Sequence, residues 1–207
     1  MTHILYKNDI PADLDLGNEI AIDTETLGLN NFRDRLCMVQ LCSGNNIAHL
    51  VHFDGTDYSA PNLKKLLSNK NILKIFHYAR FDMAILQKTF GFPIENVYCT
   101  KIASKLARTY TSAHGLKAII KEFFNIEISK KEQSSYWGFE PNEEQCKYAG
   151  NDVIYLHKIK EKMDFMLEHE GRKQLFDDTI KFLNTRVNLD LQGWLDCDIF
   201  SHGENNQ

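Results

Sequence analysis

The sequence has no apolar run that approaches the roughly 20 residues needed to span a bilayer. Its first residues lack the basic start and the long apolar stretch of a signal peptide. Its 5 cysteines are odd in number and include no Cys-x-x-Cys spacing. These absences argue against a membrane-spanning protein and a disulfide framework, and they predict a reduced, cytoplasmic protein with no membrane partner.

The sequence also has no excess of positive charge. Its 24 Lys and Arg residues are outnumbered by 28 Asp and Glu residues, which gives a formal net charge of −4. Proteins that hold long nucleic acids usually present a basic face to the phosphates. If four acids are placed in a metal site, the remaining surface is formally neutral, and bound divalent ions reverse the local charge. Such a surface fits a small substrate better than a long polyanion.

Apolar periodicity and turn signals predict an α/β domain in which a mixed sheet is flanked by helices. Strands are expected over residues 18–24, 36–42, 47–52 and 72–76, with a short extension at 97–98. Helices are expected over residues 60–67, 81–90, 101–108, 115–124, 142–170 and 172–188. Ser59 is expected to cap the first helix, and the longest helix is expected to break near Gly150. The length favours one domain over residues 1–190, with a tail over 191–207 that is partly disordered or held in a contact.

Two carboxylates lie at the end of the first predicted strand. Asp23 and Glu25 are two residues apart in a strand-like segment, so their side chains point the same way. Two surface acids near a strand end would give the same pattern, and the pair alone is a weak signal. In a metal-dependent hydrolase, Asp23 would bridge two ions, and Glu25 would hold one ion and the attacking water.

A further acid, Asp82, follows the predicted strand over 72–76 and falls in the first turn of the next helix. The helix dipole favours a carboxylate at that position, so an ordinary helix-start charge is the alternative. What favours a metal-binding role is the order along the chain, in which the strand acids are followed by this first-turn acid.

The segment Tyr-Ala-Gly-Asn-Asp at 148–152 lies in a helical pattern. Tyr148 and Asp152 are four residues apart and therefore share one face of the helix. A tyrosine on an amphipathic helix is more often a core residue. With an ordinary pKa of about 10 it would also be a poor base at neutral pH. Positioning of the attacking water is therefore the role that we assign to Tyr148, with Asp152 closing the metal site.

The four acids indicate a site for divalent metal ions. Mg²⁺ and Mn²⁺ prefer oxygen ligands, which carboxylates supply. Two such ions about 3.5–4 Å apart stabilise both the attacking and the leaving oxygen of a phosphoryl displacement. The sequence therefore predicts a nuclease site that uses two Mg²⁺ or Mn²⁺ ions, with ligands Asp23, Glu25, Asp82 and Asp152.

Taken together, these motifs resemble the three exonuclease motifs of the DEDD superfamily, in its tyrosine-bearing, ribonuclease D-like branch. The resemblance runs from about residue 18 to 170 and includes the segments 100–104 and 131–137. It implies a ribonuclease H-like exonuclease fold. It also implies 3′→5′ removal of nucleoside 5′-monophosphates with the help of two metal ions.

Some features depart from ribonuclease D, which carries further helical domains after the catalytic one. Fewer than 40 residues follow the long helix here, Ser-Tyr-Trp at 135–137 replaces the usual Ser-Asp-Trp, and His-Tyr at 77–78 replaces the usual His-Asn. The short length and the tail segment 191–196 are similar to stand-alone bacterial diribonucleases of this branch. That similarity implies a ring-shaped homo-octamer that acts on dinucleotides, including linear products of cyclic-dinucleotide breakdown.

Candidate substrate contacts are less specific. Leu27 and Leu29 follow the first acids, and an apolar side chain there would wedge against the terminal base, unless both are buried turn residues. Aromatic and guanidinium groups bind bases and phosphates. Further candidates, each with a structural role as its alternative, are His77, Tyr78, Arg80 and Trp137.

Three hypotheses follow for the function. The first is an exoribonuclease that acts on very short RNA, dinucleotides above all. The second keeps the chemistry but trims longer or structured 3′ ends of RNA or DNA. The third is a catalytically silent nucleic-acid-binding module, which is expected to have lost a metal ligand, and here none is missing.

Overall fold

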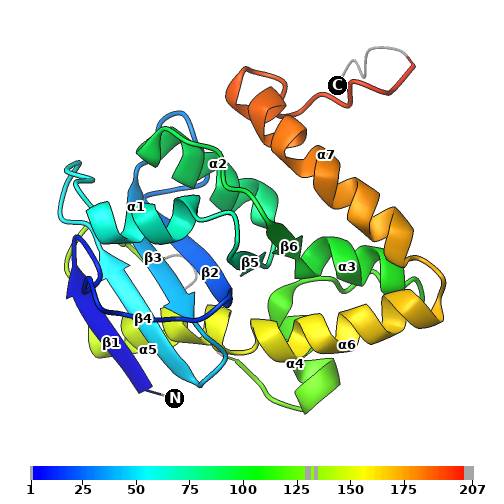
Figure 1. Cartoon of the computed structure of the whole chain (residues 1–207), viewed down its shortest axis with the longest axis horizontal. Helices are drawn as coiled ribbons and strands as arrows, with labels where there is room; N and C mark the ends of the chain where they lie inside the picture. The colour runs from blue at the N-terminus through cyan, green and yellow to red at the C-terminus, as the bar shows by residue number, and fades with distance from the viewer. Residues whose placement is uncertain (1, 129–131, 133–134, 203–207) are drawn as a thin grey trace.

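The computed structural model describes residues 2–128, 132 and 135–202, and its centre is a sheet with helices on both faces (Figure 1). Across these residues the sheet has 6 strands in the order β1-β4-β3-β2-β5-β6. The strands are β1 Thr2–Lys7, β2 Glu19–Thr26, β3 Leu36–Cys42, β4 Ile47–His52, β5 Leu73–Phe76 and β6 Val97–Cys99. Strand β3 runs antiparallel to both of its neighbours, whereas the other pairs are parallel. The predicted mixed sheet is confirmed.

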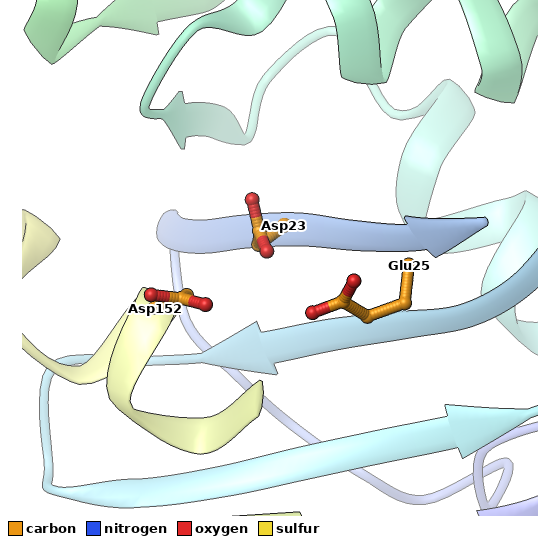
Figure 2. A group of neighbouring side chains, drawn as sticks. All are labelled: Asp23, Glu25 and Asp152. Carbon is orange, nitrogen blue, oxygen red and sulfur yellow. The ribbon is translucent and has the colours of Figure 1, made fainter. Parts of the chain in front are cut away.

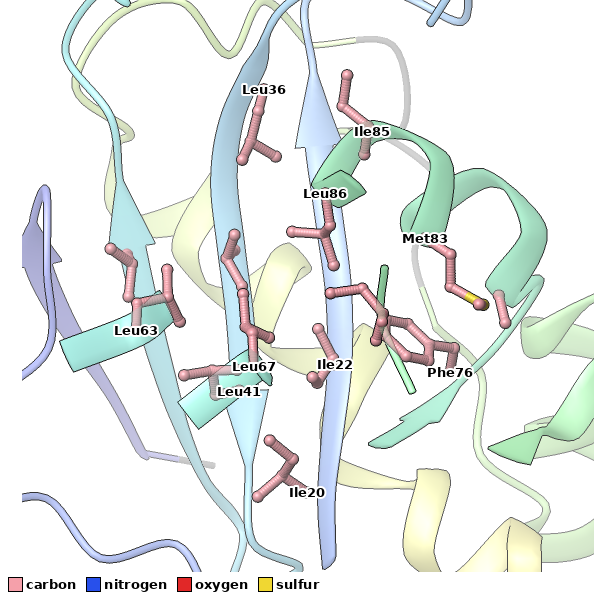
Figure 3. Close-up of a cluster of buried hydrophobic side chains, with 14 of the residues drawn as sticks. Ile20, Ile22, Leu36, Leu41, Leu63, Leu67, Phe76, Met83, Ile85 and Leu86 are labelled. Atoms are coloured by element: carbon pink, nitrogen blue, oxygen red, sulfur yellow. The ribbon is translucent and has the colours of Figure 1, made fainter. Parts of the chain in front are cut away.

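Each face of the sheet buries its own hydrophobic core. On one face, Ile20 and Ile22 of β2 pack with residues of α1 and α2 (Figure 3), and α7 contributes to the same core. These helices are α1 Pro61–Ser68, α2 Ala79–Phe90 and α7 Lys173–Leu191. On the other face, Ala21 packs in a core shared with α3 Thr100–Ala107, α4 Leu116–Phe124, α5 Glu143–Ile154 and α6 Leu156–His169. The helices therefore flank the sheet as the apolar periodicity predicts.

The alternation of side chains along β2 decides where its acids lie. Because successive strand residues point to opposite faces, Asp23 and Glu25 share a face with Ala21, and Thr24 shares the face of Ile22. Helix α5 contacts β2, β3 and β4. The two carboxylates are thus directed toward the helix that carries the Tyr-Ala-Gly-Asn-Asp segment.

Strand β1 is absent from the sequence-based prediction. It is an edge strand that pairs in parallel with β4, about 45 residues away in the chain. Ile4 and Leu5 are adjacent, and they remain 40% and 37% exposed. The segment therefore lacks the alternation that marks a half-buried strand. Its extended form depends on the distant partner, to which propensity rules give no access.

The predicted cap at Ser59 is wrong. The N-cap position of α1 is Ala60, which has no side-chain oxygen to accept a helix N–H. The carboxylate of Asp9 does this instead and accepts hydrogen bonds from the amides of Asn62 and Leu63 at 3.0 and 2.8 Å. A capping group from so far away in the sequence cannot be recognised by local spacing.

The predicted break near Gly150 is also displaced, since α5 continues to Ile154 and a turn at Tyr155 separates it from α6. Ala149 and Gly150 are both buried on the same helix. Two small neighbours let α5 lie close to the sheet, so the glycine serves packing rather than a break.

Helix α7 lies beside α2 and contacts it, and the chain then turns back at the end of α7 (Figure 1). Carbonyl oxygens of Trp194, Leu195 and Cys197 accept hydrogen bonds from Arg80 or Arg186. Residues 203–207 of the predicted tail lie outside the described residues, and the division into a domain over 1–190 and a tail over 191–207 stays a prediction. Within the part of the chain that the structure describes, no helix is long and apolar enough for a membrane span.

Candidate metal centre and active site

Three carboxylates converge between β2 and α5. Asp23, Glu25 and Asp152 each offer an oxygen that lies within 4.8 Å of the others (Figure 2). Two of them come from one face of a strand, and the third comes from a helix more than 100 residues later. Oxygens that share one octahedral Mg²⁺ lie up to about 4.2 Å apart, because each ligand distance is about 2.1 Å. Because the bound of 4.8 Å is only slightly larger, small side-chain movements would bring the three oxygens to one divalent cation.

Asp82 lies beside this group rather than within it. It is buried in the first turn of α2, where its Oδ1 accepts a hydrogen bond of 2.7 Å from the Thr24 hydroxyl. Thr24 points to the face of β2 that α2 covers, so the bond fixes Asp82 at the end of the strand. The fourth predicted ligand is thus adjacent to the three that converge.

The electrostatics of the group favour a bound cation. Burial, followed by the charges of Asp82, Asp152 and Glu25, raises the pKa of Asp23 well above its usual value. Burial, followed by the charges of Asp152 and Asp82, raises the pKa of Glu25 well above its usual value as well. Burial raises the pKa of Asp82 and of Asp152 to about 7. Ionised carboxylates held this close repel one another, which destabilises the folded protein until a cation neutralises them. Carboxylate oxygens are also the ligands that Mg²⁺ and Mn²⁺ prefer.

Tyr148 and Trp137 form the aromatic side of the site. Burial, then the negative charges of Asp152, Glu25 and Asp23, raises the pKa of the Tyr148 phenol. The hydroxyl therefore stays protonated at neutral pH and serves as a hydrogen-bond donor. Trp137 is only 2% exposed, and its ring centroid lies 6.2 Å from that of Tyr148. In this position Trp137 packs behind the phenol and limits its orientation.

Two lysines that the sequence-based prediction misses also line the cavity. Lys117, in the first turn of α4, lies 4.8 Å from the centroid of the Tyr148 ring. Its charge lowers the pKa of both Glu25 and Asp152. Lys101, in α3, lies 4.1 Å above the ring of Tyr78. Neither lysine was predicted as a site residue, because each reaches the cavity only when its helix packs against α6.

The carboxylates open into a cavity of about 740 Å³. Of the predicted substrate contacts, the lining includes Leu27, Leu29, His77 and Trp137. Leu29 is 86% exposed and Leu27 is 38% exposed. The alternative that these two leucines are buried turn residues is therefore wrong.

His77 is held as a neutral ring. Its Nδ1 lies 2.8 Å from the hydroxyl of Thr100, which donates to the Phe76 carbonyl oxygen. Burial and the charge of Lys101 lower the pKa of His77 to about 3. At neutral pH the imidazole thus offers polar contact to the cavity without positive charge.

Tyr78 and Arg80 are placed differently from the other candidates, since neither lines the cavity. Tyr78 is 45% exposed, with its ring against Lys101 at the edge of the site. The Arg80 guanidinium binds the buried carboxylate of Asp190 and the Leu195 carbonyl oxygen. The position of Arg80 therefore contradicts a direct phosphate contact, because its donors are directed to α7. Of the loop over 131–137, Lys131, Gln133 and Ser134 lie outside the described residues.

A cluster of acids at the end of a central strand, closed by a helix tyrosine and aspartate, defines a class of metal-dependent phosphodiester hydrolases. Residues 7–168 match the family described as 3′-5′ exonuclease. The chain belongs to this family, as an exonuclease of the ribonuclease D and NrnC type. The resemblance inferred from the motifs is confirmed.

Solved structures of NrnC (nano-RNase C) from Brucella melitensis resemble the whole chain. The one bound to pGG is 48% identical, has a TM-score of 0.94, and covers 98% of this chain and 100% of that chain. The one with bound Mg²⁺ is 47% identical, with a TM-score of 0.92 and the same coverage of 98% and 100%. These similarities confirm the ribonuclease H-like exonuclease fold.

Ribonuclease D of Escherichia coli (strain K12) is 29% identical over 153 residues. The match covers 73% of this chain and 40% of that relative, so the chain spans well under half of its length.

Proposed function

We propose that the chain is a metal-dependent 3′→5′ exoribonuclease that hydrolyses very short RNA, dinucleotides above all, to nucleoside 5′-monophosphates. The observation that carries this proposal is the convergence of Asp23, Glu25 and Asp152 at the wall of a cavity of about 740 Å³, with Asp82 adjacent. The set is complete, which argues against a catalytically silent binding module. A cytoplasmic location is consistent with this proposal and stays a prediction.

The four carboxylates are proposed to hold two divalent ions, Mg²⁺ or Mn²⁺. When bound, such ions stabilise the charge that develops on the phosphate and lower the pKa of water. The protonated Tyr148 hydroxyl, which is hydrogen-bonded to Asp152, is placed to orient the attacking water. Lys117 adds positive charge on the side of the cavity nearest to Glu25 and Asp152. The water oxygen bonds to phosphorus as the bond from phosphorus to the 3′ oxygen of the preceding nucleotide breaks; that oxygen takes up a proton, and the 3′ nucleotide leaves as its 5′-monophosphate.

The preference for short RNA rests on three features. The cavity falls within the range of about 300–1,000 Å³ that is typical of small-ligand sites. Leu29 offers an exposed apolar surface at the cavity, suited to contact with a base. The formal charge of −4 provides little general attraction for a long polyanion. One similar protein, Brucella NrnC, has been solved with bound pGG, which agrees with this preference.

A length series tests the substrate preference. End-labelled RNAs of 2, 3, 5 and 10 nucleotides are compared by initial rate at equal concentration with Mg²⁺. We expect the 2-nucleotide RNA to be hydrolysed at least about 10-fold faster than the others, because a single small-ligand site can enclose only a short chain. Equal rates at all lengths would favour the ribonuclease D-like alternative. A DNA dinucleotide in the same assay decides between RNA and DNA.

A ring-shaped homo-octamer is part of the same proposal, and its support is the resemblance to stand-alone diribonucleases. Light scattering checks it directly. A mass near that of the 24.0 kDa chain would refute the ring, whereas about eight times that mass would agree with it.

Lys117→Met is expected to lower kcat/KM for a dinucleotide by about 10- to 100-fold. A hydrogen bond or ion pair to a charged group contributes about 1.5–3 kcal/mol, which corresponds to that range. Lys117→Arg, which keeps the charge, is expected to retain most of the activity. Lys121→Met is the control, since Lys121 lies on the same helix with its ammonium group 2.7 Å from Glu127. Equal losses in both lysine-to-methionine variants would contradict a role for Lys117 at the site.

A further inference from the structure

An ion pair joins the helix of Asp82 to the last helix of the described chain. Arg80 lies in the first turn of α2, two residues before Asp82. Its Nε and Nη2 donate to the two carboxylate oxygens of Asp190, and the Nη2–Oδ1 distance is 2.7 Å. Such a two-point contact between guanidinium and carboxylate fixes direction as well as distance.

Asp190 is suited to hold Arg80 rigidly. Its side chain is 3% exposed in the last turn of α7. Arg186 is its second partner, with Nη2 2.6 Å and Nε 3.0 Å from Oδ1. A buried carboxylate between two guanidinium groups is held in position, since each of its oxygens accepts a hydrogen bond.

The chain end completes this network. Arg80 also donates to the Leu195 carbonyl oxygen at 2.6 Å, and Arg186 donates to that of Cys197 at 3.1 Å. Beside it, the Gln87 amide donates to the Asn188 side-chain oxygen at 2.7 Å. The contacts therefore connect α2 to both the end of α7 and the segment after it.

What the network holds is the start of α2. Tyr78, directly before the helix, has a backbone φ of 72°. This lies in the left-handed region, which residues other than glycine rarely adopt. A backbone of this kind persists only where the surroundings hold it. His77, which lines the cavity, lies on one side of Tyr78, and Asp82 lies four residues after it. Arg80 is thus placed to maintain the backbone conformation that orients the side chains of His77 and Asp82.

We propose that Asp190 is a positioning residue of the active site, which acts through Arg80 to fix the first turn of α2 and thereby Asp82. This inference rests on the proposed metal-binding role of Asp82. It assigns a catalytic consequence to α7, which lies beyond the residues that match the exonuclease family. The side chain of Asp190 itself does not line the cavity.

The test is Asp190→Asn in the full chain, which keeps the shape and removes the charge. We expect kcat for a dinucleotide to fall by about 10- to 100-fold, the range seen when a group that orients a metal ligand is lost. KM should change less than about threefold, because neither Asp190 nor Arg80 lines the cavity. Calorimetric titration with Mn²⁺ alone should show affinity weakened by a similar factor. Asp178→Asn is the control on the same helix, where Asp178 forms an exposed pair with Lys181.

Leu183→Ala separates positioning from loss of stability. Leu183 is a buried core residue of α7 and has no part in the ion pair. This variant is expected to melt at a lower temperature, yet to keep Mn²⁺ affinity and kcat at a temperature where it is folded. The proposal is overturned if Asp190→Asn keeps the kcat and Mn²⁺ affinity of the original chain, or if Leu183→Ala loses both equally. Failure of the proposed function would look different, since the unaltered chain itself would then bind no Mn²⁺ or hydrolyse no RNA.

Discussion

Asp152→Asn is expected to reduce hydrolysis of a dinucleotide by about 10³-fold or more. Loss of one metal ligand removes several kcal/mol of transition-state stabilisation, and each 1.36 kcal/mol corresponds to a factor of ten in rate. The amide has nearly the same shape as the carboxylate but carries no charge. Asp152 is one of only three residues, among those the structure describes, whose oxygens converge within 4.8 Å. Initial rates with saturating Mg²⁺ and again with Mn²⁺ measure the loss.

The same variant should fold at least as well as the original chain. Removal of one charge from the cluster relieves repulsion that raises the pKa of Asp23 and Glu25. The metal-free Asp152→Asn protein is therefore expected to melt at an equal or higher temperature. Asp178→Asn is the control, because it removes an exposed carboxylate that pairs with Lys181 on α7 and does not line the cavity. Activity of Asp152→Asn within tenfold of the original would exclude this aspartate as a metal ligand.

The local sequence predicts those site residues that lie in pairs on one strand or one helix. Asp23 and Glu25 follow from the two-residue period of a strand, and Tyr148 and Asp152 follow from the four-residue spacing of a helix. Asp82 was predicted from its place in the first turn of a helix, which the structure confirms. In each case the spacing within one element already fixes the relative direction of the side chains.

The residues that the sequence-based prediction misplaced depend on packing between distant elements. Lys117 reaches the cavity only because α4 packs against α6, and no spacing in its own helix indicates this. Arg80 has the chemistry of a phosphate contact, but Asp190, 110 residues later, binds its guanidinium. Side-chain type and local period contain no information about such partners.

The same distinction applies to the fold. Strands β3 and β4 begin and end at the predicted residues, because the apolar runs and the turn between them are local signals. Strand β1 and the cap of α1 were not predicted correctly, because both depend on long-range hydrogen bonds. Strand β1 pairs with β4, and the first amides of α1 donate to Asp9. Local patterns thus fixed the centre of the sheet, whereas its edge and the helix cap needed the tertiary structure.

Removal of divalent ions is expected to abolish activity and to make stability depend on pH in an unusual direction. Burial raises the pKa of Asp82 and of Asp152 to about 7, whereas an unfolded aspartate has a pKa of about 3.9. A group whose pKa is raised on folding stabilises the folded state most below its unfolded pKa. That stabilisation is lost as the pH rises from about 4 through about 7. In EDTA, the melting temperature should therefore be lower at about pH 8 than at about pH 5.

The size of the effect follows from linkage. Each unit of pKa shift corresponds to about 1.4 kcal/mol, and a chain of this length loses about 2–4 °C per kcal/mol. We expect a decrease of about 5 °C or more across that pH range, measured by thermal melting in EDTA. Saturating Mn²⁺ should restore the loss at the higher pH, because at 100 times its Kd a bound ligand adds about 2.7 kcal/mol.

Asp152→Asn is the matched control for the pH experiment, since it removes one of the titrating carboxyl groups. Its melting temperature in EDTA should change less between about pH 5 and about pH 8, and Mn²⁺ should stabilise it less. A metal-free protein that is equally stable at both pH values would show that the carboxylates ionise without mutual strain. The carboxylates would then need no cation to offset their repulsion, and the proposed metal site would lose its electrostatic support.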